Sequence, residues 1–379
     1  MIKLNFQTII RKMEFLQKDK RFPKIYIIVV NWNGWKDTIE CLESLLSIEY
    51  PNYKIIVVDN GSSDDSLKYM IDWTKGNINI ESKFITLPFK KPIKFSLIEW
   101  QGYVSFIPED SLITFIKNKK NAGYSGGNNI GIQFALKNKA DFTFILNNDT
   151  VVDKNILKEF LSAYEIFGPA CYGAKFYYYS NPKKIQFSGV IFDFLRMNFY
   201  NSCFNVNNFK EIFYAYGAGF FLPCSIFEEI GLFDERLLLF EENDLCCRIK
   251  KKGYKIILVP TAIIYHKVSS SFNKNKANIV YFYTRSRFLW VKKNLNIFWK
   301  IWLFLVFTLD LLWSFLVILL EFPIVLLISL FKLLKCIIFQ KSSKESFTFI
   351  VEKVKHRVLK IKMKILGFRD YMLRKFCIL

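Results

Sequence analysis

The segment KIYIIVVNWNGWKDTIECLESLLSIEYPNYKIIVVDNGSSDDS, residues 24–66, decides the fold. An apolar run at 24–30 and a second one within 54–66 are each typical of a buried strand that ends in a polar loop. A helix is expected between them from about Asp37, because four apolar side chains share one stripe: Ile39, Leu42, Leu45 and Leu46. Strands buried on both faces that alternate with amphipathic helices are typical of a mostly parallel sheet covered by helices. The segment therefore predicts an α/β fold.

In such a sheet the ligand crevice lies outside the carboxyl ends of the strands. The sequence places polar side chains at these ends: Asn31, Asn33, Asp59, Asn60 and Asp149. A carboxylate beside a loop of Asn, Gly and Ser can accept a hydrogen bond from a base or a ribose hydroxyl, but the same residues also cap helices. Both interpretations of these loops stay open from the local sequence.

The rest of the soluble part continues the pattern with one loose region. We expect residues 87–111 to be an insertion, residues 112–116 to form a strand and residues 156–167 to form a helix. Four further runs are typical of strands: KFYYY (175–179), GVIFD (189–193), KIILVP (255–260) and AIIYH (262–266). The predicted domains are a basic lead-in at 1–23, an α/β domain at 24–290 and a helical region with a basic tail at 291–379.

An apolar segment at 297–339 changes the character of the chain. Its charges Asp310, Glu321 and Lys332 recur every 11 residues, which keeps them on one face of a helix. Residues 301–320 are long enough to span a bilayer, yet an Asp near the middle of a span costs about 2.5 to 3.5 kcal/mol.

Three interpretations of this segment follow. Two apolar helices hinged at Pro323 that lie in the membrane interface, or dip into it, keep both basic flanks on one side. A single transmembrane span and a soluble face for a homo-oligomer are the alternatives. The interfacial interpretation leads, because a span would carry the basic tail away from the cytosol.

The charge of the chain supports a membrane partner. Lys and Arg number 54 against 33 Asp and Glu, a net charge of +21. Residues 322–379 alone hold 13 basic residues against three acids, directly after the most apolar part of the chain. Basic charge beside an apolar segment favours an anionic membrane surface over nucleic acid. Eight cysteines without a CxxC spacing and the lack of a signal-like start predict the cytoplasmic face of the cell membrane.

Four further motifs suggest chemistry. The loop NAGYSGGNNIGI (121–132) opens a helix, where free backbone N–H groups favour an anion such as a diphosphate. It is neither a Walker loop nor a GxGxxG fingerprint, which speaks against a nicotinamide enzyme. The stretch DFTFILNNDTVVD (141–153) runs from an apolar strand into Asn147, Asn148 and Asp149. Its end is either a turn or a metal site.

His266 ends the predicted strand AIIYH, which should deliver it to the same crevice. Beside Asp149 it would complete a mixed oxygen and nitrogen site for Mg²⁺ or Mn²⁺, although a lone histidine is more often structural. The acidic cluster FEENDLCCR (240–248) holds Glu241, Glu242 and Asp244. Carboxylates this close repel one another, which raises the pKa of at least one of them. The alternative is a solvated start of a helix, where the helix dipole favours acidic side chains.

Taken together and in this order, the five motifs resemble the family 2 glycosyltransferases over about residues 24–290. Within that family they are most similar to rhamnosyltransferase-like enzymes of cell-surface polysaccharide synthesis. The resemblance implies a GT-A fold, a nucleotide-diphosphate sugar donor, a divalent metal (Mg²⁺ or Mn²⁺) and inversion at the anomeric carbon. It also implies a lipid-linked or cell-surface glycan as the acceptor.

The resemblance also assigns roles to residues. It implies general-base catalysis by Glu242, with Asp244 as the reserve, and a metal held by Asp149 and His266, in an Asp-x-Asp position whose first Asp is replaced by Asn147. Contacts to the nucleotide sugar are implied for Asn31, Asn33, Asp59, Asn121, Gly126, Gly127, Asn128, Asn147 and Asn148.

The processive QxxRW signature is missing from YTRSRFLW (283–290), so addition of a single sugar is expected. A dTDP- or UDP-sugar is expected as donor, with rhamnose suggested only by the subgroup. The alternative function is a catalytically impaired nucleotide-sugar-binding or scaffold protein of the glycan assembly machinery.

Overall fold

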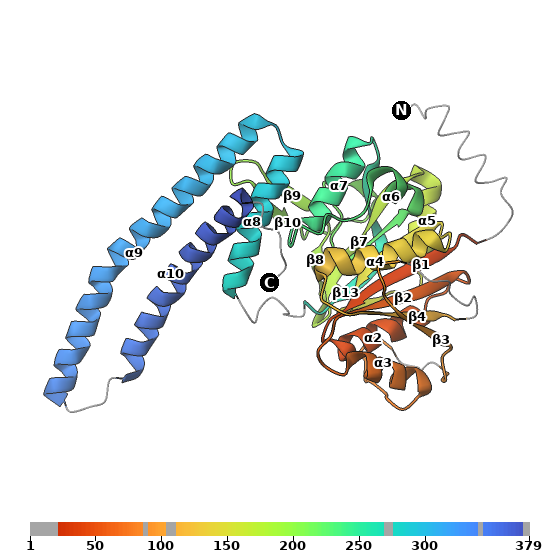
Figure 1. The fold of residues 1–379 in the computed structure, drawn as a ribbon, viewed down its shortest axis with the longest axis horizontal. Coiled ribbons are helices and arrows are strands. Elements are labelled where there is room, and N and C mark those ends of the chain that lie inside the picture. Colours follow the sequence, from red (N-terminus) through yellow and green to blue (C-terminus); the bar gives the residue numbers. More distant parts are fainter. Residues whose placement is uncertain (1–21, 86–89, 104–110, 269–275, 340–343, 374–379) are drawn as a thin grey trace.

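The computed structural model describes residues 22–85, 90–103, 111–268, 276–339 and 344–373. It consists of an α/β body and a long helical arm that projects from one side of it (Figure 1). Within the body, an 11-stranded sheet has the order β11-β13-β7-β12-β5-β1-β2-β4-β3, with β6 and β8 paired at its side.

The amino-terminal half of the body is a parallel, doubly wound unit. Strands β1, β2, β4 and β5 pair in parallel, and β3 joins β4 in parallel at the edge. Helices α2 and α3 cover one face of the sheet and α4 covers the other (Figure 1). The elements are β1 (Ile25–Asn31), α2 (Trp35–Leu46), β2 (Tyr53–Asn60), α3 (Ser66–Lys75), β3 (Phe95–Glu99), β4 (Ile113–Asn118), α4 (Gly123–Lys137) and β5 (Phe142–Asn147).

The second half makes the sheet mixed. Strand β12 lies antiparallel between β5 and β7, whereas β13 runs parallel to β7. The predicted α/β class with a mostly parallel central sheet flanked by helices is therefore confirmed. The elements are β6 (Thr150–Val152), α5 (Ile156–Phe167), β7 (Ala170–Tyr178), β8 (Asn181–Phe187), β9 (Val190–Asp193), β10 (Asn198–Asn201), β11 (Lys210–Glu211), β12 (Gly219–Pro223), α6 (Cys224–Ile230), α7 (Glu241–Lys251) and β13 (Lys255–His266).

The central strands are buried on both faces, which explains their continuous apolar sequences. Ile27, Val57 and Phe144 on β1, β2 and β5 are inaccessible to solvent. Helices on both sides leave no face of these strands for polar residues until the strands end. The polar residues of the motifs are therefore confined to the strand ends.

Two details differ from the predicted elements. Within 87–111, residues Phe95–Glu99 form the edge strand β3, while 86–89 and 104–110 lie outside the described residues. The two strands expected at 255–266 are one strand, β13, whose pairing with β7 shifts between Val259 and Ile263. Pro260 lies in this irregularity, because a residue without an N–H cannot donate to a regular ladder.

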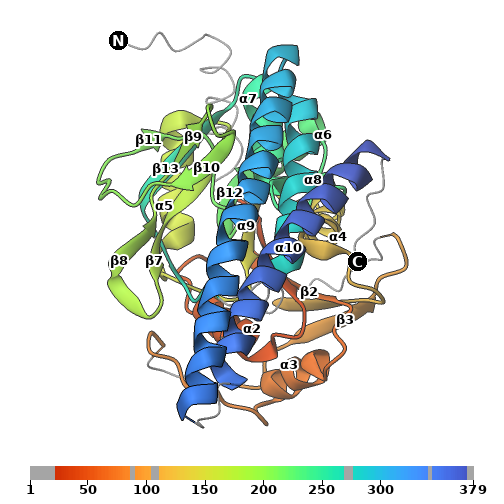
Figure 2. The ribbon, with the colours of Figure 1, turned by 90° about the vertical axis from the view of Figure 1, so that its left-hand side faces the viewer.

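The arm is built from three helices: α8 (Lys276–Asn294), α9 (Ile297–Phe339) and α10 (Lys344–Met372). The predicted hinge at Pro323 is wrong, since α9 continues through it; a proline removes one helical hydrogen bond but does not have to end a helix. Helix α10 folds back beside α9 towards α8 (Figures 1 and 2). Gly367 permits this return, because a Cβ there would lie 2.5 Å from the carbonyl oxygen of Tyr281 on α8.

A second hydrophobic core joins the arm to the body. Trp290 on α8 packs against Phe199 of the β9–β10 hairpin at a ring distance of 5.1 Å. Phe288 on α8 contacts Phe307 on α9 and Phe368 on α10. The arm is thus anchored by aromatic packing.

The first part of α9, Ile297–Leu320, is the one helix among the described residues that is long and apolar enough to cross a membrane. This finding rests on length and composition alone, and the mean hydropathy is 2.5. Only 11% of its most apolar window is buried within the protein. Most of its apolar side chains therefore face outwards.

Candidate active site

The site lies where the strand order of the sheet reverses. The chain passes from β1 to β2 and β4 on one side, then returns through α4 to β5 on the other side of β1. Asn31 at the end of β1 is in register with Asp59, and its neighbour Val30 is in register with Asn147 on β5. Such a switch point opens a crevice at the carboxyl ends of the strands. The structure thus brings three predicted site residues to one edge.

Asn31 and Asp59 form a fixed polar pair on the floor of this crevice. Nδ2 of Asn31 donates to Oδ1 of Asp59 at 2.9 Å and to the Ser62 hydroxyl at 3.1 Å. The Thr38 hydroxyl donates to Oδ1 of Asn31 at 2.8 Å, which fixes the amide orientation. Burial raises the pKa of Asp59, while the hydrogen bonds from Ser62 and Asn31 oppose that rise.

Asn33 ties the loop after β1 to the loop after β2. Its backbone is left-handed, with φ of 51°, a conformation that asparagine tolerates better than most residues. Its Oδ1 accepts hydrogen bonds from the backbone N–H groups of Ser63 and Asp64 at 2.8 and 3.2 Å. Asn33 therefore shapes the rim of the crevice by joining the two loops.

Asn121 is hydrogen-bonded to another asparagine, Asn60, and so joins the end of β2 to the loop before α4. Asn60, at the end of β2, donates to Oδ1 of Asn121 at 3.1 Å and to the carbonyl oxygen of Gly123 at 2.9 Å. Oδ1 of Asn60 accepts from the backbone N–H of Ala122 at 3.1 Å. Asn60 was noted only as a strand-end residue, yet it organises the loop that begins α4.

The start of α4 differs from the expected anion loop. The helix begins at Gly123, so the N–H groups of Gly126 and Gly127 already fall within its ladder and are not free for a diphosphate. A Cβ on Gly127 would lie 2.7 Å from Cγ1 of Val30, so this glycine lets α4 pack closely on β1. Within the described residues, the buried Ser125 hydroxyl and Oδ1 of Asn128 lack hydrogen-bond partners. These two atoms are the better candidates for a ligand.

Asn147 and Asn148 point to different neighbours. Asn148 donates to the Thr38 hydroxyl at 2.9 Å, which joins its loop to the start of α2. The Asn147 side chain lines a cavity, and its backbone N–H donates to the carbonyl oxygen of Ala218 at 3.0 Å. Asn148 thus orients the loop, while Asn147 is available to a ligand.

Asp149 and His266 meet as their positions in the sequence suggested. Oδ1 of Asp149 lies 3.2 Å from Nε2 of His266, and both side chains are nearly buried. His266 ends β13, where it is in register with Thr150 of β6. The amide oxygen of Gln186 on β8 lies 3.1 Å from Nδ1 of His266. The sequence offered no signal for Gln186.

The chemistry of this pair suits a cation. An amide oxygen only accepts hydrogen bonds, so the contact with Gln186 places a hydrogen on Nδ1 of His266, and Nε2 is the ring nitrogen that faces Asp149. The carboxylate of Asp149 and the imidazole of His266 lie 3.2 Å apart at one edge of the sheet. One carboxylate and one imidazole suit Mn²⁺ or Mg²⁺. No group of three or more His, Cys, Asp and Glu side chains forms among the described residues, so water or ligand oxygens would complete the shell.

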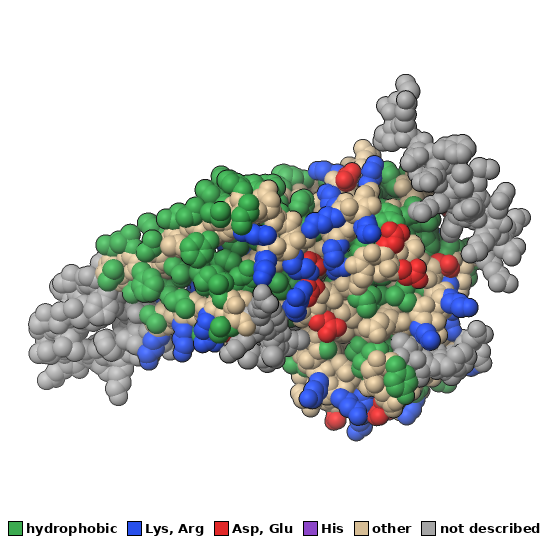
Figure 3. All heavy atoms as spheres, turned by 45° about the horizontal axis from the view of Figure 1, so that its top comes forward, with side chains coloured by type: hydrophobic (Ala, Val, Ile, Leu, Met, Phe, Trp, Pro, Cys, Tyr) green, Lys and Arg blue, Asp and Glu red, His purple; other side chains and the backbone are tan. Residues whose placement is uncertain are grey.

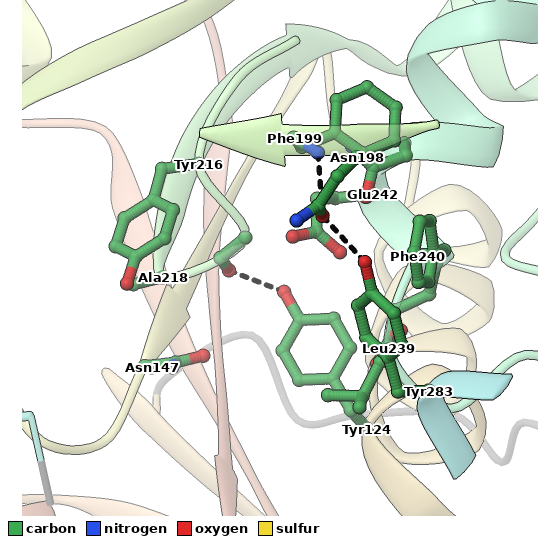
Figure 4. Close-up of a pocket in the computed structure, with 13 residues that line it drawn as sticks. Tyr124, Asn147, Asn198, Phe199, Tyr216, Ala218, Leu239, Phe240, Glu242 and Tyr283 are labelled. Carbon is green, nitrogen blue, oxygen red and sulfur yellow. Dashed lines mark hydrogen bonds between the residues drawn. The ribbon is translucent and has the colours of Figure 1, made fainter. Parts of the chain in front are cut away.

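A cavity of about 370 Å³ is lined in part by Tyr216 (Figure 4), whose ring lies 5.9 Å from the ring of His266. Glu242 and Asn147 face it from opposite sides, and the ring of Tyr216 stands on the same wall as Asn147 (Figure 4). Burial, and then the charges of Glu242 and Asp149, raise the pKa of Tyr216 to about 12. Because Tyr216 lines the cavity and also packs against His266, the cavity and the Asp149–His266 pair adjoin each other.

Glu242 is a partly buried acid with a raised pKa. It lies in the first turn of α7, and burial raises its pKa to about 7. The neighbouring Glu241 also has a raised pKa, because it is buried and close to Glu242. Leu239 and Phe240, directly before α7, are both left-handed, with φ of 70° and 80°. Non-glycine residues in this conformation store strain of a kind that often accompanies functional sites.

Asp244 lies outside the cavity lining. Its carboxylate is inaccessible and is held by Arg248 at 3.0 Å and Lys293 at 2.8 Å. Nδ2 of Asn294 donates to it at 3.0 Å. These partners neutralise it and tie α7 to α8, so its environment is that of a structural residue.

Most of the aromatic cavity wall was not among the predicted site residues. Tyr124 donates to the carbonyl oxygen of Gly217, and Tyr283 donates to Oδ1 of Asn198 (Figure 4). The glycine-rich run YGAGFFLP contains Tyr216 and Gly217 and was the one available signal for this wall. The other wall residues come from elements that are distant in sequence: Asn198, Phe199, Leu239, Phe240 and Tyr283.

Two family models match this chain. The model described as "Glycosyl transferase family group 2" matches residues 142–342, and the model described as "Glycosyl transferase family 2" matches residues 26–91. Together they include Asn31, Asp59, Asp149, Glu242 and His266, whereas the loop at 121–132 lies outside both matches.

Two curated relatives are similar in sequence. The "Low-salt glycan biosynthesis hexosyltransferase Agl10" of Haloferax volcanii is 26% identical over 155 residues, which are 38% of this chain and 48% of that protein. The "Uncharacterized protein y4gI" of Sinorhizobium fredii is 23% identical over 263 residues, which are 66% of this chain and 25% of that protein. The matches thus span half or less of each relative.

Solved structures show weaker likenesses. S. aureus TarS 1-349 in complex with UDP has a TM-score of 0.44 and 14% identity, with 71% of this chain and 65% of that chain covered. GalNAc-T7 with UDP, GalNAc and Mn²⁺ has a TM-score of 0.49 and 16% identity, with 71% and 51% covered.

Proposed function

This chain belongs to glycosyltransferase family 2, and from that premise we propose that it transfers a single sugar from a nucleotide-diphosphate sugar to an acceptor hydroxyl, with inversion at the anomeric carbon. The observation that carries the proposal is the position of Glu242. A carboxylate with a pKa of about 7 lines a cavity that adjoins the crevice at the strand ends. A group with this pKa is suited to accept a proton near neutral pH.

Glu242 acts as the general base in this proposal. It takes the proton from the acceptor hydroxyl as that oxygen attacks the anomeric carbon from the face opposite the leaving group. The new bond joins the acceptor oxygen to the sugar, and the bond between the sugar and the diphosphate breaks. The nucleoside diphosphate departs with the bonding electron pair, and the proton remains on Glu242.

The crevice holds the donor. Asn31 and Asp59 present a fixed polar pair for the nucleoside, and Asn33 holds the two loops that frame it. The Ser125 hydroxyl and Oδ1 of Asn128 have unused hydrogen-bonding capacity near the start of α4. A dTDP- or UDP-sugar is the proposed donor, and rhamnose is the proposed sugar.

Asp149 and His266 would hold Mg²⁺ or Mn²⁺ on the diphosphate side of the site. When bound, the metal supplies positive charge that stabilises the developing charge of the leaving group. The protein's own contribution is to hold Asp149 and His266 in place. Gln186 contacts Nδ1 of His266 and orients its ring, and the hydrogen bond from Asn148 to the Thr38 hydroxyl positions the backbone before Asp149.

The proposed acceptor is a lipid-linked glycan at the cytoplasmic face of the cell membrane. The outward-facing apolar side chains of α9 support membrane attachment. Helix α10 carries eight Lys and Arg residues and contacts α9, where Nζ of Lys364 lies 2.6 Å from Oδ2 of Asp310. Each basic residue costs about 2.5 to 3.5 kcal/mol at the centre of a bilayer. The helix pair therefore favours the interfacial interpretation over a span.

The test is nucleoside diphosphate release from a panel of dTDP-, UDP- and GDP-sugars, with Mn²⁺, Mg²⁺ or EDTA. We expect release with one donor class and a divalent metal, and a loss of about 10² to 10⁴-fold in Glu242→Gln. Glu228→Gln, an exposed carboxylate on α6, is the matched control and should retain full activity.

Two outcomes contradict parts of the proposal. Turnover that survives both Glu242→Gln and Asp149→Asn would remove these residues from catalysis. Tight binding of a donor without any turnover in the unaltered chain would favour the alternative, a nucleotide-sugar-binding or scaffold protein.

A further inference from the structure

The β9–β10 hairpin has one apolar face that the body does not cover. Phe192 and Phe199 pack inwards, each with its ring centroid less than 6 Å from that of Trp290. Ile191 and Tyr200, which are cross-strand partners, are 57% and 43% exposed. A two-stranded hairpin with apolar residues on both faces has more apolar surface than its own packing requires.

The tip of the hairpin is also apolar and is attached to α9. Phe194 and Leu195 are 46% and 71% exposed. Phe194 contacts Trp299 at a ring distance of 5.0 Å, and Nε1 of Trp302 donates to the carbonyl oxygen of Leu195 at 2.9 Å. The tip therefore moves with the first two turns of α9.

Helix α9 presents an apolar stripe next to this tip. Outward-facing apolar residues recur along the helix with helical spacing: Ile297, Ile301, Phe304, Leu305, Leu312, Leu316 and Leu319. Asp310 lies off the stripe and turns to Lys364 on α10. The hairpin tip and the stripe thus form one surface, which we call the apolar surface.

Basic side chains accompany the apolar surface. Arg196 follows the hairpin tip with its side chain 76% exposed, and Lys355, Lys360 and Lys362 are exposed on α10. Figure 3 shows hydrophobic side chains gathered over the arm, with Lys and Arg along one edge and at its base. Apolar side chains bordered by basic ones suit the interface of an anionic bilayer, where charge and apolar burial act together.

The same hairpin forms part of the cavity wall. Asn198 and Phe199, at the start of β10, line the cavity that contains Glu242. Tyr283 on α8 donates to Oδ1 of Asn198 at 2.5 Å, so the arm and the hairpin meet at this wall. Only Met197 and Arg196 separate Asn198 from the exposed tip.

We propose that the β9–β10 hairpin is a lipid-contacting element, whose residues Phe194 and Leu195 enter an anionic phospholipid surface beside α9 and hold the cavity wall at Asn198 against that surface. The contact with lipid is independent of the proposed function. The consequence that a lipid-linked acceptor enters the cavity from the membrane side rests on the proposed function.

The test is flotation of the full chain with vesicles of phosphatidylcholine that contain about 30% phosphatidylglycerol, the anionic lipid that basic side chains attract. Phe194→Ser combined with Leu195→Ser should lower vesicle partitioning about tenfold, because two apolar side chains no longer leave water. Ile166→Ser on α5 is the matched control, since Ile166 is also exposed, at 56%, but lies away from the apolar surface.

A second readout follows the hairpin itself. Amide hydrogen exchange across residues 190–201 should slow when the vesicles are added. Leu195→Ser alone is the second variant: it should lower vesicle partitioning in the same direction, and its thermal unfolding without lipid should match that of the unaltered chain. The side chain of Leu195 is 71% exposed, so this result checks that the fold is intact.

Equal partitioning of the double variant and the unaltered chain would overturn the proposal. So would a stable dimer in solution that protects residues 190–201 without lipid, or the absence of any vesicle binding. Nucleoside diphosphate release is measured separately without vesicles. Donor turnover without lipid binding overturns the hairpin's role alone, whereas lipid binding without turnover overturns only the proposed function.

Discussion

At the scale of residues, the site depends on carboxyl groups that the fold keeps partly neutral. Glu241 and Glu242 are adjacent on α7, and burial raises the pKa of both. The acidic cluster predicted this rise, because charges so close repel one another. The sequence could not show that Glu241 and Glu242 line the cavity while Asp244 does not, since that depends on how the left-handed turn at Leu239 and Phe240 begins α7.

The raised pKa of Glu242 predicts a cost in stability. Its ordinary value is 4.5 and its folded value is about 7, so the folded chain binds the proton more tightly than the unfolded chain. Stability therefore falls as pH rises from about 4.5 through about 7. Glu242→Gln removes this cost, and we expect it to raise the free energy of unfolding at pH 8 by about 1 to 3 kcal/mol.

Denaturant unfolding at pH 5 and pH 8 measures this effect. The gain should be smaller at pH 5, and the exposed control Glu228→Gln should show no gain at either pH. An equal gain at both pH values would mean that packing, and not ionisation, causes the change. The same variant should lose turnover, so stability and activity are expected to move in opposite directions.

Residue identity predicted the meeting of Asp149 and His266 better than it predicted the start of α4. Asp149 lies between β5 and β6, and His266 ends β13, where it is in register with Thr150 of β6. Gly126 and Gly127 suggested free N–H groups, but the helix starts three residues earlier and uses them. A glycine needed for close helix packing looks the same in sequence as one needed for a phosphate.

At the scale of elements, the contact between α4 and β1 sets the shape of the crevice. A Cβ on Gly127 would lie 2.7 Å from Cγ1 of Val30 and 3.1 Å from Nδ2 of Asn60. Gly127→Ala should therefore push α4 from the sheet and cost about 1 to 3 kcal/mol of stability, the usual range for overpacking. The donor KM should rise, because Asn60 holds the loop before α4.

Urea denaturation and donor titration check this prediction. Gln133→Ala on the same helix is the control and should change stability by less than about 0.5 kcal/mol. An unchanged stability in Gly127→Ala would show that α4 can move without cost, which would weaken the account of this glycine as a packing residue.

Strands and helices with a regular apolar pattern could be predicted from the sequence. Pairings that depend on residues far apart in the sequence could not. The strands β1 and β2 and the helix α5 agree with their apolar patterns to within two residues. The strand expected at 189–193 is β9, but its pairing with β10 was not predicted, because both faces of this hairpin carry aromatic residues and show no clear alternation. Its position depends on Trp290 and Trp302, which are more than 90 residues further along the chain.

At the scale of the whole molecule, the positive charge and the exposed apolar side chains together favour binding to an anionic membrane. The chain has a net charge of +21, and α10 brings eight basic residues back along the arm. We expect binding to vesicles with phosphatidylglycerol to weaken about tenfold when salt rises from about 0.1 to 0.5 M, because salt screens surface charges.

Flotation at several salt concentrations measures this dependence, with pure phosphatidylcholine vesicles as the control that should bind weakly throughout. Binding that resists both high salt and alkaline extraction would instead indicate that Ile297–Leu320 spans the bilayer. Composition alone could not separate these outcomes, since the decisive contact of Asp310 with Lys364 joins residues 54 positions apart.

Because α10 folds back along α9, the two ends of the arm can be observed separately by fluorescence. Helix α9 has 43 residues, which corresponds to about 65 Å at 1.5 Å per residue, comparable to the range over which paired dyes exchange energy. A dye at Leu373, exposed at the end of α10, would sit near the catalytic body, and a partner at Leu320 would sit well along α9. The transfer efficiency between them would report whether the arm keeps its fold when it meets a bilayer.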